Sequence, residues 1–249
     1  MNITPFLMHE EPRLVFFSGA GLSKESGINT FRDAGGTWEK FDVMKVCNID
    51  TFHLNYESVH AFYNARRVQL STVHPNDAHL FIAEMQKKYG SRVVHFTANV
   101  DDLCERAGGS ACHIHGSLLE VIEDFSTKGE SAEIKTLGYE EWTPVPGVIS
   151  KPNVVFFGEA IRYENGKKTY IYDDMTNVLY ALRPQDTCIV IGSGDQVLEW
   201  SWMAGKQSQA FAMNVNPSIQ EYDDRYQLNV YKSATEAVPD MRKLIEERM

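Results

Sequence analysis

Glycines and small polar residues gather directly after the first apolar run of the chain. Ser18-Gly19-Ala20-Gly21 is followed by Ser23, Ser26-Gly27-Ile28 and Phe31-Arg32. Glycines let backbone amides approach a pyrophosphate closely, and the N-terminus of a following helix adds the positive end of its dipole. The third glycine of a G-x-G-x-x-G pattern is missing at the usual spacing, so the run also suits a plain strand-to-helix turn. Phe31 beside Arg32 favours a dinucleotide site, because a turn needs neither an aromatic surface nor a cation.

Polar side chains also follow a second apolar run, in Thr97-Ala98-Asn99-Val100-Asp101-Asp102. If that run is a strand next to the first, its carboxyl end opens into the same crevice and brings Asn99 and Asp101 to the dinucleotide site. The same residue types also form Asx turns and helix N-caps, because Asn and Asp accept hydrogen bonds from backbone amides. The residues alone leave both interpretations open.

Two histidines, His113 and His115, stand two positions apart before Gly116. A pair of imidazoles can bind a metal, but no carboxylate or cysteine lies at a ligand-like spacing, so the pattern does not indicate a metal site. A histidine close to a crevice can instead act as a general base on a sugar hydroxyl, since its ordinary pKa lies near neutrality. The alternative is a histidine that is simply packed or exposed.

A candidate carboxylate clamp lies in residues 61–67, with the sequence AFYNARR. On a helix, Tyr63 and Arg66 are three positions apart and share one face. A phenol beside a guanidinium suits a carboxylate, because arginine can donate to both oxygens at once. An exposed helix with a stacked tyrosine and arginine would show the same spacing.

The hydrophobic pattern predicts the elements that must position these residues. Short continuous apolar runs predict strands that are covered on both faces, over Arg13–Phe17, Arg92–Thr97, Thr187–Gly192 and Ala210–Val215. Amphipathic stretches between them predict helices over Asn76–Tyr89, Asp173–Leu182 and Pro239–Glu247. Strands that alternate with helices predict an α/β fold with a doubly wound, parallel, Rossmann-like sheet.

Two insertions interrupt this alternation. Residues 36–75 are mostly helical in pattern, whereas residues 117–152 are polar and loop-like, with a TPVPG turn cluster. We therefore expect a smaller inserted domain formed by residues 36–75 and 117–152. Beside it we expect a discontinuous dinucleotide-binding domain, which comprises residues 1–35, 76–116 and 153–249.

Three further segments belong to the expected crevice. Gly192-Ser193-Gly194 and Asn214-Val215-Asn216-Pro217 each follow a predicted strand, where nucleotide-contacting loops lie in such folds. The segment Lys151–Glu159 is typical of an extended strand that ends in a turn. Its edge could accept a peptide as an added strand, or it could pair inside the smaller domain.

Composition limits the class of protein and of partner. The 249 residues (28.3 kDa) suffice for one or two domains, and 43% hydrophobic with 23% charged residues is an ordinary globular composition. The net charge of 24 − 34 = −10 excludes a basic nucleic-acid surface and is compatible with a lysine-rich peptide partner. Four scattered cysteines without a C-x-x-C pair predict reduced thiols. Without a signal peptide or an apolar run of about 20 residues, we expect a cytoplasmic protein that contacts no membrane.

Taken in order from about Arg13 to the C-terminus, these segments resemble the sirtuins, a family of NAD-dependent protein deacylases. Each motif alone is weak, whereas the ordered set is very specific. Residues 61–67 (AFYNARR) and 74–80 (HPNDAHL) most resemble the bacterial and mitochondrial branch that removes negatively charged acyl groups. The likeness rests on the glycine-rich loop, Phe31-Arg32-Asp33, Thr97–Asp101, His115-Gly116, Lys151-Pro152, Phe157-Gly158-Glu159, Gly192-Ser193 and Asn216-x-Ser218.

The resemblance implies a role for each matching residue. His115 resembles the catalytic base that deprotonates a ribose hydroxyl of NAD, and Asn99 resembles the residue that orders the ribose and a catalytic water. Tyr63 and Arg66 match the pair that binds a succinyl or malonyl carboxylate. Asp101 matches the contact to the nicotinamide carboxamide. The other implied cofactor contacts are Gly19, Ala20, Gly21, Ser23, Ile28, Phe31, Arg32, Trp38, Asn99, Val100, Gly192, Ser193, Asn216, Pro217 and Ala234. The other implied substrate contacts are Val155, Phe157, Gly158 and Glu159.

Two positions depart from the family pattern. The family's structural zinc module normally lies between the catalytic histidine and the strand near Phe157, where paired C-x-x-C motifs hold the metal. Residues 116–187 contain no cysteine, so the sequence predicts a reduced module with no zinc and no other metal. The family's glutamine before the catalytic asparagine is Ala98 here, which removes a side chain that bonds ribose hydroxyls.

The resemblance therefore implies an NAD-dependent protein-lysine deacylase, a desuccinylase or demalonylase as well as a deacetylase. It would transfer the acyl group to ADP-ribose, release nicotinamide, and act on acylated-lysine proteins or peptides. Two alternatives stay open: an NAD glycohydrolase or ADP-ribosyltransferase on the same scaffold, and a sensor that binds NAD or ADP-ribose without turnover. Ala98 and the reduced module keep the glycohydrolase or transferase open. Asn99, Asp101 and His115 argue against the sensor, because binding alone needs no base.

Overall fold

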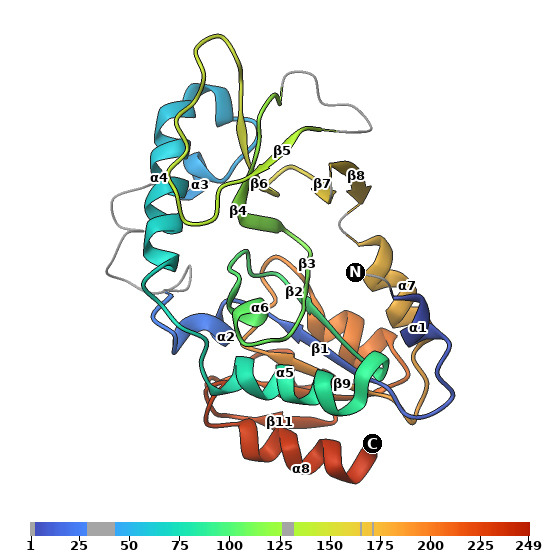
Figure 1. The fold of residues 1–249 in the computed structure, drawn as a ribbon. Helices are drawn as coiled ribbons and strands as arrows, with labels where there is room; N and C mark the ends of the chain where they lie inside the picture. The colour runs from blue at the N-terminus through green and yellow to red at the C-terminus, as the bar shows by residue number, and fades with distance from the viewer. Residues whose placement is uncertain (1–2, 29–42, 126–131, 165, 171) are drawn as a thin grey trace.

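A six-stranded sheet forms the centre of the computed structural model, which describes residues 3–28, 43–125, 132–164, 166–170 and 172–249. Its order is β11-β10-β9-β1-β2-β3, and every neighbouring pair is parallel (Figure 1). The expected doubly wound sheet is confirmed, and each of the four predicted strands agrees to within one residue at either end. The strands are β1 (Leu14–Ser18), β2 (Val93–Thr97), β3 (Cys112–His113), β9 (Thr187–Ile191), β10 (Phe211–Val215) and β11 (Leu228–Val230).

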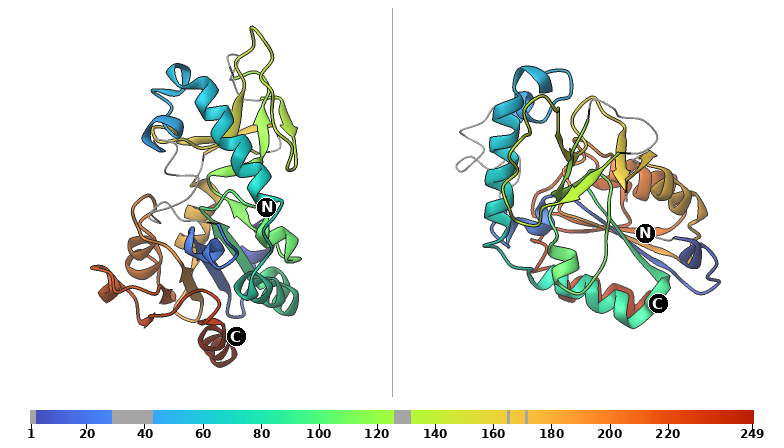
Figure 2. Two further views of the ribbon diagram at one scale, coloured as in Figure 1. Left: turned by 90° about the vertical axis from the view of Figure 1, so that its left-hand side faces the viewer. Right: turned by 45° about the horizontal axis from the view of Figure 1, so that its top comes forward.

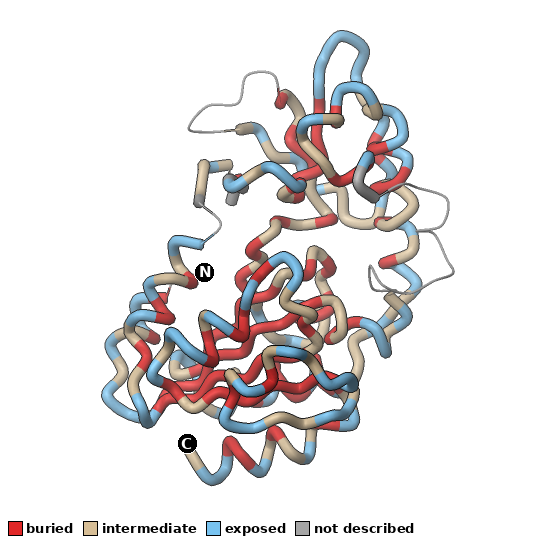
Figure 3. The backbone as a smooth tube through the Cα atoms, turned by 180° about the vertical axis from the view of Figure 1, so that it is seen from behind, coloured by how far each residue is buried: buried red, intermediate tan, exposed pale blue. Residues whose placement is uncertain are grey.

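Helices cover both faces of this sheet (Figure 2). On one face, α5 (Asp77–Tyr89) and α8 (Val238–Arg248) bury residues such as Phe81 and Met241 against Phe16. The other face packs against α1 (Thr4–Leu7), α7 (Asp173–Ala181) and a π-helical segment, η4 (Ser201–Gln207). Because side chains from both faces are covered, all five residues of β1 are buried, and the strands form the buried centre in Figure 3. This explains the continuous apolar runs in the sequence.

A smaller layer lies beyond the carboxyl ends of the parallel strands (Figure 1, top). There α4 (Tyr56–Leu70) packs against an antiparallel sheet of order β5-β4-β6, and a shared apolar cluster includes Phe62, Leu118 and Phe156. The expectation of a loop-like 117–152 is wrong in part, because these residues supply strands of this sheet. These strands form although polar and apolar residues alternate only weakly in this part of the sequence. The other elements here are α3 (Val43–Val46), η2 (Phe52–Leu54), β4 (Gly116–Ile122), β5 (Ile134–Thr136), β6 (Lys151–Val154), β7 (Ile161–Glu164) and β8 (Lys167–Tyr170).

Short helical turns complete the chain. They are α2 (Gly21–Lys24), η3 (Gly90–Arg92), α6 (Leu103–Arg106) and η5 (Asp223–Arg225). Two of them, α2 and α6, follow β1 and β2 directly, so they begin at the candidate site. Among the described residues, no helix is both long and apolar enough to cross a membrane.

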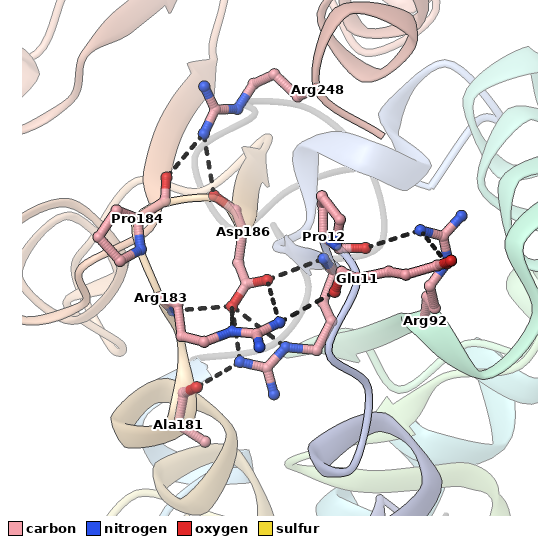
Figure 4. A network of polar contacts seen from close by, with 9 residues as sticks. Glu11, Pro12, Arg92, Ala181, Arg183, Pro184, Asp186 and Arg248 are labelled. Atoms are coloured by element: carbon pink, nitrogen blue, oxygen red, sulfur yellow. Dashed lines mark hydrogen bonds and ion pairs between the residues drawn. The ribbon is translucent and has the colours of Figure 1, made fainter.

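A buried ionic cluster closes the amino end of the sheet (Figure 4). Asp186 is fully buried and lies 2.7 Å from Arg13 Nη2, which itself is 2% exposed. The Arg13 backbone N–H donates to Asp186 Oδ1 at 2.9 Å, and Arg183 N donates to Oδ2 at 2.8 Å. Burial raises the pKa of the Asp186 carboxyl, but these arginine hydrogen bonds outweigh burial and hold the pKa below its ordinary value.

Candidate active site

Two glycine-containing loops interlock at the carboxyl ends of β1 and β9, the neighbouring strands at which the strand order reverses. Gly21 N donates to Gly192 O at 2.9 Å, and Gly19 N donates to Ile191 O at 3.0 Å. A Cβ on Gly21 would lie 2.5 Å from the Gly192 Cα, and Gly192 itself has φ +62°, so both positions require glycine. Between them, the Ala20 amide donates to no residue that the structure describes. Such an amide is suited to a pyrophosphate oxygen.

The loop that follows β10 supports the loop that follows β9. Asn216 Nδ2 donates to Ser193 O at 2.7 Å, and Asn216 Oδ1 accepts from Ser218 N at 3.1 Å. Pro217 is exposed beside them. Of the predicted contacts in this region, Ala234 lies apart, with its side chain buried in the apolar cluster under α8. Ser193 and Asn216 therefore extend the glycine loops along the same edge of the sheet.

Ser23 joins side chains from three elements. Its hydroxyl donates to Asp101 Oδ2 at 2.9 Å, accepts from Asn99 Nδ2 at 3.1 Å, and lies 3.4 Å from His79 Nε2. Asn76 N donates to His79 Nδ1 at 3.2 Å, so the proton of the neutral ring is on Nε2 and faces Ser23. Burial lowers the pKa of His79 to about 4 and raises the pKa of Asp101. The structure thus brings Ser23, Asn99 and Asp101 together as predicted.

The sequence analysis misses His79, although a local signal exists. Asn76 precedes α5 and accepts hydrogen bonds from Ala78 N and His79 N. His79 Nδ1 in turn accepts a hydrogen bond from the Asn76 amide, which makes a capping box with histidine at its third helical position. The Asn76-x-x-His79 spacing could therefore have placed His79 at the start of the helix, at the edge of the site.

A second polar chain fixes Asn99 from inside the sheet. Ser18 Oγ donates to Thr97 Oγ1 at 2.8 Å, and Asn99 N donates to the same oxygen at 3.1 Å. The Ser18 hydroxyl also lies 2.8 Å from His95 Nε2. Burial lowers the pKa of His95 to about 3, so this neutral ring donates its Nε2 proton to Ser18. The sequence predicts that His95 is a core residue. Its contact with Ser18 becomes apparent only from the pairing of β1 with β2.

Both histidines of the 113–115 segment contact the backbone of the same turn. His115 Nδ1 donates to Ala98 O at 3.2 Å. In the neutral ring the lone pair is then on Nε2, the atom that a general base uses. His113 Nδ1 donates to Asn99 O at 2.8 Å, and His113 Nε2 lies 3.2 Å from Glu105 Oε1. The structure therefore places the His115 ring against the Ala98 carbonyl, in the turn that contains Asn99.

A small cavity of about 30 Å³ lies between α4 and the Asn99–Asp101 turn. Ile28, Val100 and Leu118 contribute apolar walls, and Arg66 and Asp101 contribute the charged groups. The predicted cofactor contacts Ile28, Val100 and Asp101 thus meet the predicted substrate contact Arg66.

Tyr63 lies deeper in the protein than Arg66. Tyr63 is 4% exposed, stacks on Phe156 with ring centroids 5.6 Å apart, and has its hydroxyl 3.5 Å from Cys47 Sγ. Burial raises the pKa of the Tyr63 phenol, which keeps it neutral. Arg66 Nη1 donates to Gln69 Oε1 at 3.2 Å. Burial lowers the pKa of Arg66, and the nearby Tyr63 and Asp101 partly offset this.

The predicted substrate segment after β6 is tied to the candidate base. Val155 N donates to His115 O at 2.9 Å. Phe157 is 36% exposed, and Gly158 beside it has φ +88°. Glu159 faces the protein, because its Oε2 lies 2.9 Å from Lys151 Nζ. The ion pair between Glu159 and Lys151 therefore anchors this segment to the rest of the protein.

Three predicted cofactor contacts, Phe31, Arg32 and Trp38, lie outside the described residues. Across the described ranges, no three His, Cys, Asp or Glu side chains lie close enough together to hold a metal ion. All four cysteines are buried thiols.

Comparison with known proteins identifies the family. The sequence model of the Sir2 family matches residues 19–199. The chain belongs to the Sir2 family. An NAD-dependent protein deacylase of Helicobacter hepaticus is 36% identical over 95% of this chain and 98% of its own length. An NAD-dependent protein deacylase of Shigella flexneri is 33% identical over 95% of this chain and 85% of its own length.

Solved Sir2 structures share the fold. A Sir2 homologue in complex with NAD matches with a TM-score of 0.76 at 26% identity, over 98% of this chain and 93% of that one. A mutant Sir2 homologue in complex with ADP-ribose also matches with a TM-score of 0.76 at 26% identity, over the full length of both chains. This Sir2-family chain is an NAD-dependent protein deacylase.

Proposed function

We propose that this deacylase removes acyl groups from lysine side chains of proteins or peptides, with His115 as general base and Asn99 as the residue that orders the reacting groups. The observation that carries the proposal is the hydrogen bond from His115 Nδ1 to Ala98 O, at 3.2 Å. It leaves Nε2 as the basic nitrogen beside Asn99. A protein that only binds a nucleotide has no need of an imidazole held in one tautomer.

The residues around the glycine loops fit NAD. The Ala20 amide and the backbone of Gly19 and Gly21 suit the pyrophosphate, and the loop held by Asn216 suits the adenosine end. The Asn99 Oδ1 atom accepts from no described residue, so it can accept from a hydroxyl group. When bound, NAD supplies the ribose that receives the acyl group, with nicotinamide as the leaving group. The chain's own contribution is to orient the reactants and to exclude water.

The acyl group of the substrate is proposed to end in a carboxylate, as in succinyl or malonyl lysine. Arg66 supports this, because its guanidinium lines a cavity whose other walls are mostly apolar. Apolar walls suit the methylene chain of the acyl group, and a guanidinium suits its terminal oxygens. Acetyl lysine has no terminal charge, so Arg66 discriminates between the two kinds of substrate.

The smaller layer is proposed to hold together without zinc. Asn64 pairs with the backbone of Trp142 through two hydrogen bonds of 2.8 Å, and Trp142 Nε1 donates to Ser150 Oγ at 2.7 Å. The Tyr56 hydroxyl accepts from Ser150 N at 3.0 Å. These contacts join the 137–150 loop to α4. The loop lies in the part of the chain where the family normally has its zinc module. Metal analysis of the purified protein tests this, and one zinc per chain would contradict it.

Nicotinamide release tests the proposed activity. The protein is incubated with NAD, with and without a succinyl-lysine peptide, and His115→Tyr is assayed in parallel. We expect release that depends on the peptide and is accompanied by O-acyl-ADP-ribose, and we expect no turnover by His115→Tyr. Release without peptide would indicate an NAD glycohydrolase, and no release would indicate a sensor. Substantial activity of His115→Tyr would show that His115 is not the general base.

Arg66→Met tests the acyl preference. We expect kcat/KM for succinyl peptide to fall at least about tenfold, because a charge-assisted hydrogen bond contributes roughly 1.5–3 kcal/mol, while kcat/KM for acetyl peptide changes far less. Arg242→Met on α8 removes an exposed arginine and should leave both substrates unaffected. Equal losses on both peptides would make Arg66 a structural residue.

A further inference from the structure

His113 lies between two fixed hydrogen-bond acceptors at the candidate catalytic turn. It ends β3, where its backbone pairs with Thr97 of β2. Its Nδ1 is 2.8 Å from Asn99 O, and its Nε2 is 3.2 Å from Glu105 Oε1. A backbone carbonyl has no proton to donate, and an ionised carboxylate has none either. Both ring nitrogens must therefore carry hydrogen in this arrangement.

We propose that His113 works as an imidazolium, a positioning residue that holds the Asn99 carbonyl through one N–H and the Glu105 carboxylate through the other. This inference rests on the proposed function, in which Asn99 and His115 perform the chemistry. Two histidines that stand two residues apart then have opposite protonation states. His115 bonds one carbonyl and keeps a basic nitrogen, whereas His113 bonds two acceptors and keeps none.

The surrounding charges favour the protonated ring. Glu105 Oε1 also accepts from Ala111 N at 3.0 Å. Burial raises the pKa of Glu105, but the hydrogen bond and charge of His113 together with the backbone hydrogen bonds outweigh burial and lower it. Burial lowers the pKa of His113, but its contacts with the carboxylate and the carbonyl outweigh burial and raise it. Asp101 also faces the ring and attracts its charge, while His95 of β2 faces it as a neutral imidazole.

Loss of one proton from His113 would replace a donor by a lone pair. One of the two oxygens would then face that lone pair at hydrogen-bond distance and be repelled. Asn99 is otherwise anchored by its N–H on Thr97 and by its side chain on Ser23, so the carbonyl contact is a third anchor of the turn. We expect turnover to rise with pH as His115 becomes neutral, and to fall as the pH passes through the raised pKa of His113.

Glu105→Gln separates positioning from a merely structural role. The amide keeps the size of the side chain and an oxygen for Ala111 N, but it removes the charge that holds the proton on His113. We expect the alkaline limb of kcat to move down by about one pH unit, so that kcat there falls about tenfold while the acidic limb stays. Glu84→Gln, which breaks an exposed ion pair with Arg242, should leave both limbs in place. An unmoved alkaline limb in Glu105→Gln would overturn the proposal.

Nitrogen NMR of the ¹⁵N-histidine protein tests the protonation state without turnover. The His113 signals are assigned by their loss in His113→Gln. Both nitrogens should stay protonated above the ordinary histidine pKa of about 6.5, and a ring with one unprotonated nitrogen there would overturn the proposal. If the wild type releases no nicotinamide at any pH, the proposed function fails, whereas the spectrum still decides the state of His113.

Discussion

At the amino end of the parallel sheet, Asp186 is fully buried and accepts hydrogen bonds from Arg13 and Arg183. At the carboxyl end, Asp101 is 7% exposed and accepts from the Ser23 hydroxyl at 2.9 Å and from Leu103 N at 3.2 Å. Burial raises the pKa of both carboxyls. At Asp186 the arginines outweigh burial and lower the pKa. At Asp101 the two neutral donors and the charge of His113 do not outweigh burial, and the pKa stays raised.

The two ends therefore serve different purposes. A buried carboxylate with a lowered pKa stabilises the folded chain in its ionised form, whereas one with a raised pKa costs stability at neutral pH. The carboxyl end also contains interlocked glycines and neutral histidines, at His79 and His95, that are held for their hydrogen-bonding direction. Functional sites commonly sacrifice stability in this way, and the rest of the fold offsets the loss.

Replacing a glycine at the carboxyl end should have the largest effect. In Gly192→Ala, a backbone with φ +62° would carry a Cβ that lies 2.5 Å from Gly21 Cα. Left-handed strain and a backbone clash together should cost more than about 4 kcal/mol in the free energy of unfolding, or displace the loop and abolish NAD binding. Urea unfolding and calorimetric titration with NAD measure the two outcomes.

Gly138→Ala is the matched control. Gly138 has φ +61°, almost the same as Gly192, but a Cβ there would meet nothing within 4 Å. Its cost should be about 1–2 kcal/mol of strain alone, with NAD binding unchanged. Equal effects of the two substitutions would show that the close contact between the loops after β1 and β9 contributes neither to the free energy of unfolding nor to NAD binding.

The sequence predicts the parts of this comparison that depend on local pattern. The four long parallel strands are continuous apolar runs, and the Gly19–Gly21 and Thr97–Asp101 segments follow two of them, so a parallel sheet brings them to one edge. These features need only periodicity and the rule that crossover connections are right-handed. The role of His115 comes instead from the resemblance to the sirtuins, because the residues around it also suit a packed or exposed histidine.

The remaining features depend on contacts between distant residues. Arg13 and Asp186 are 173 positions apart, and nothing in either neighbourhood indicates the other. His95 lies within an apolar run, and its bond to Ser18 exists only because β1 and β2 pair in register. Strands β3 and β11 have two and three residues, too few for any alternation to appear. Such features follow from the assembled sheet, which determines which side chains face one another.

Asp186→Asn should have the next largest effect, at the amino end. The asparagine leaves Arg13 and Arg183 buried or half-buried without their counter-charge, which should lower the free energy of unfolding by about 3 kcal/mol at pH 7. Since the folded pKa of Asp186 is lowered, its contribution is present above about pH 4 and is lost as the pH falls through that pKa. The difference from wild type in urea unfolding should therefore shrink in acid. Glu84→Gln, in an exposed ion pair with Arg242, should cost less than about 0.5 kcal/mol. A loss as large as that of Asp186→Asn would show that the buried pair contributes no more than an exposed one.

Asp101→Asn should have the smallest effect on stability, with the opposite sign of pH dependence. Because the folded pKa of Asp101 is raised, the favourable state is the protonated one, which is lost as the pH rises through that pKa. At pH 7 the asparagine, which cannot ionise, should match or exceed the wild-type stability within about 1 kcal/mol, and the advantage should disappear toward pH 4. The same variant should release little nicotinamide, since the resemblance to the sirtuins implies that Asp101 contacts the nicotinamide carboxamide. A loss of stability as large as that of Asp186→Asn would show that Asp101, too, serves mainly to hold the fold, and the two ends of the sheet would then no longer differ in kind.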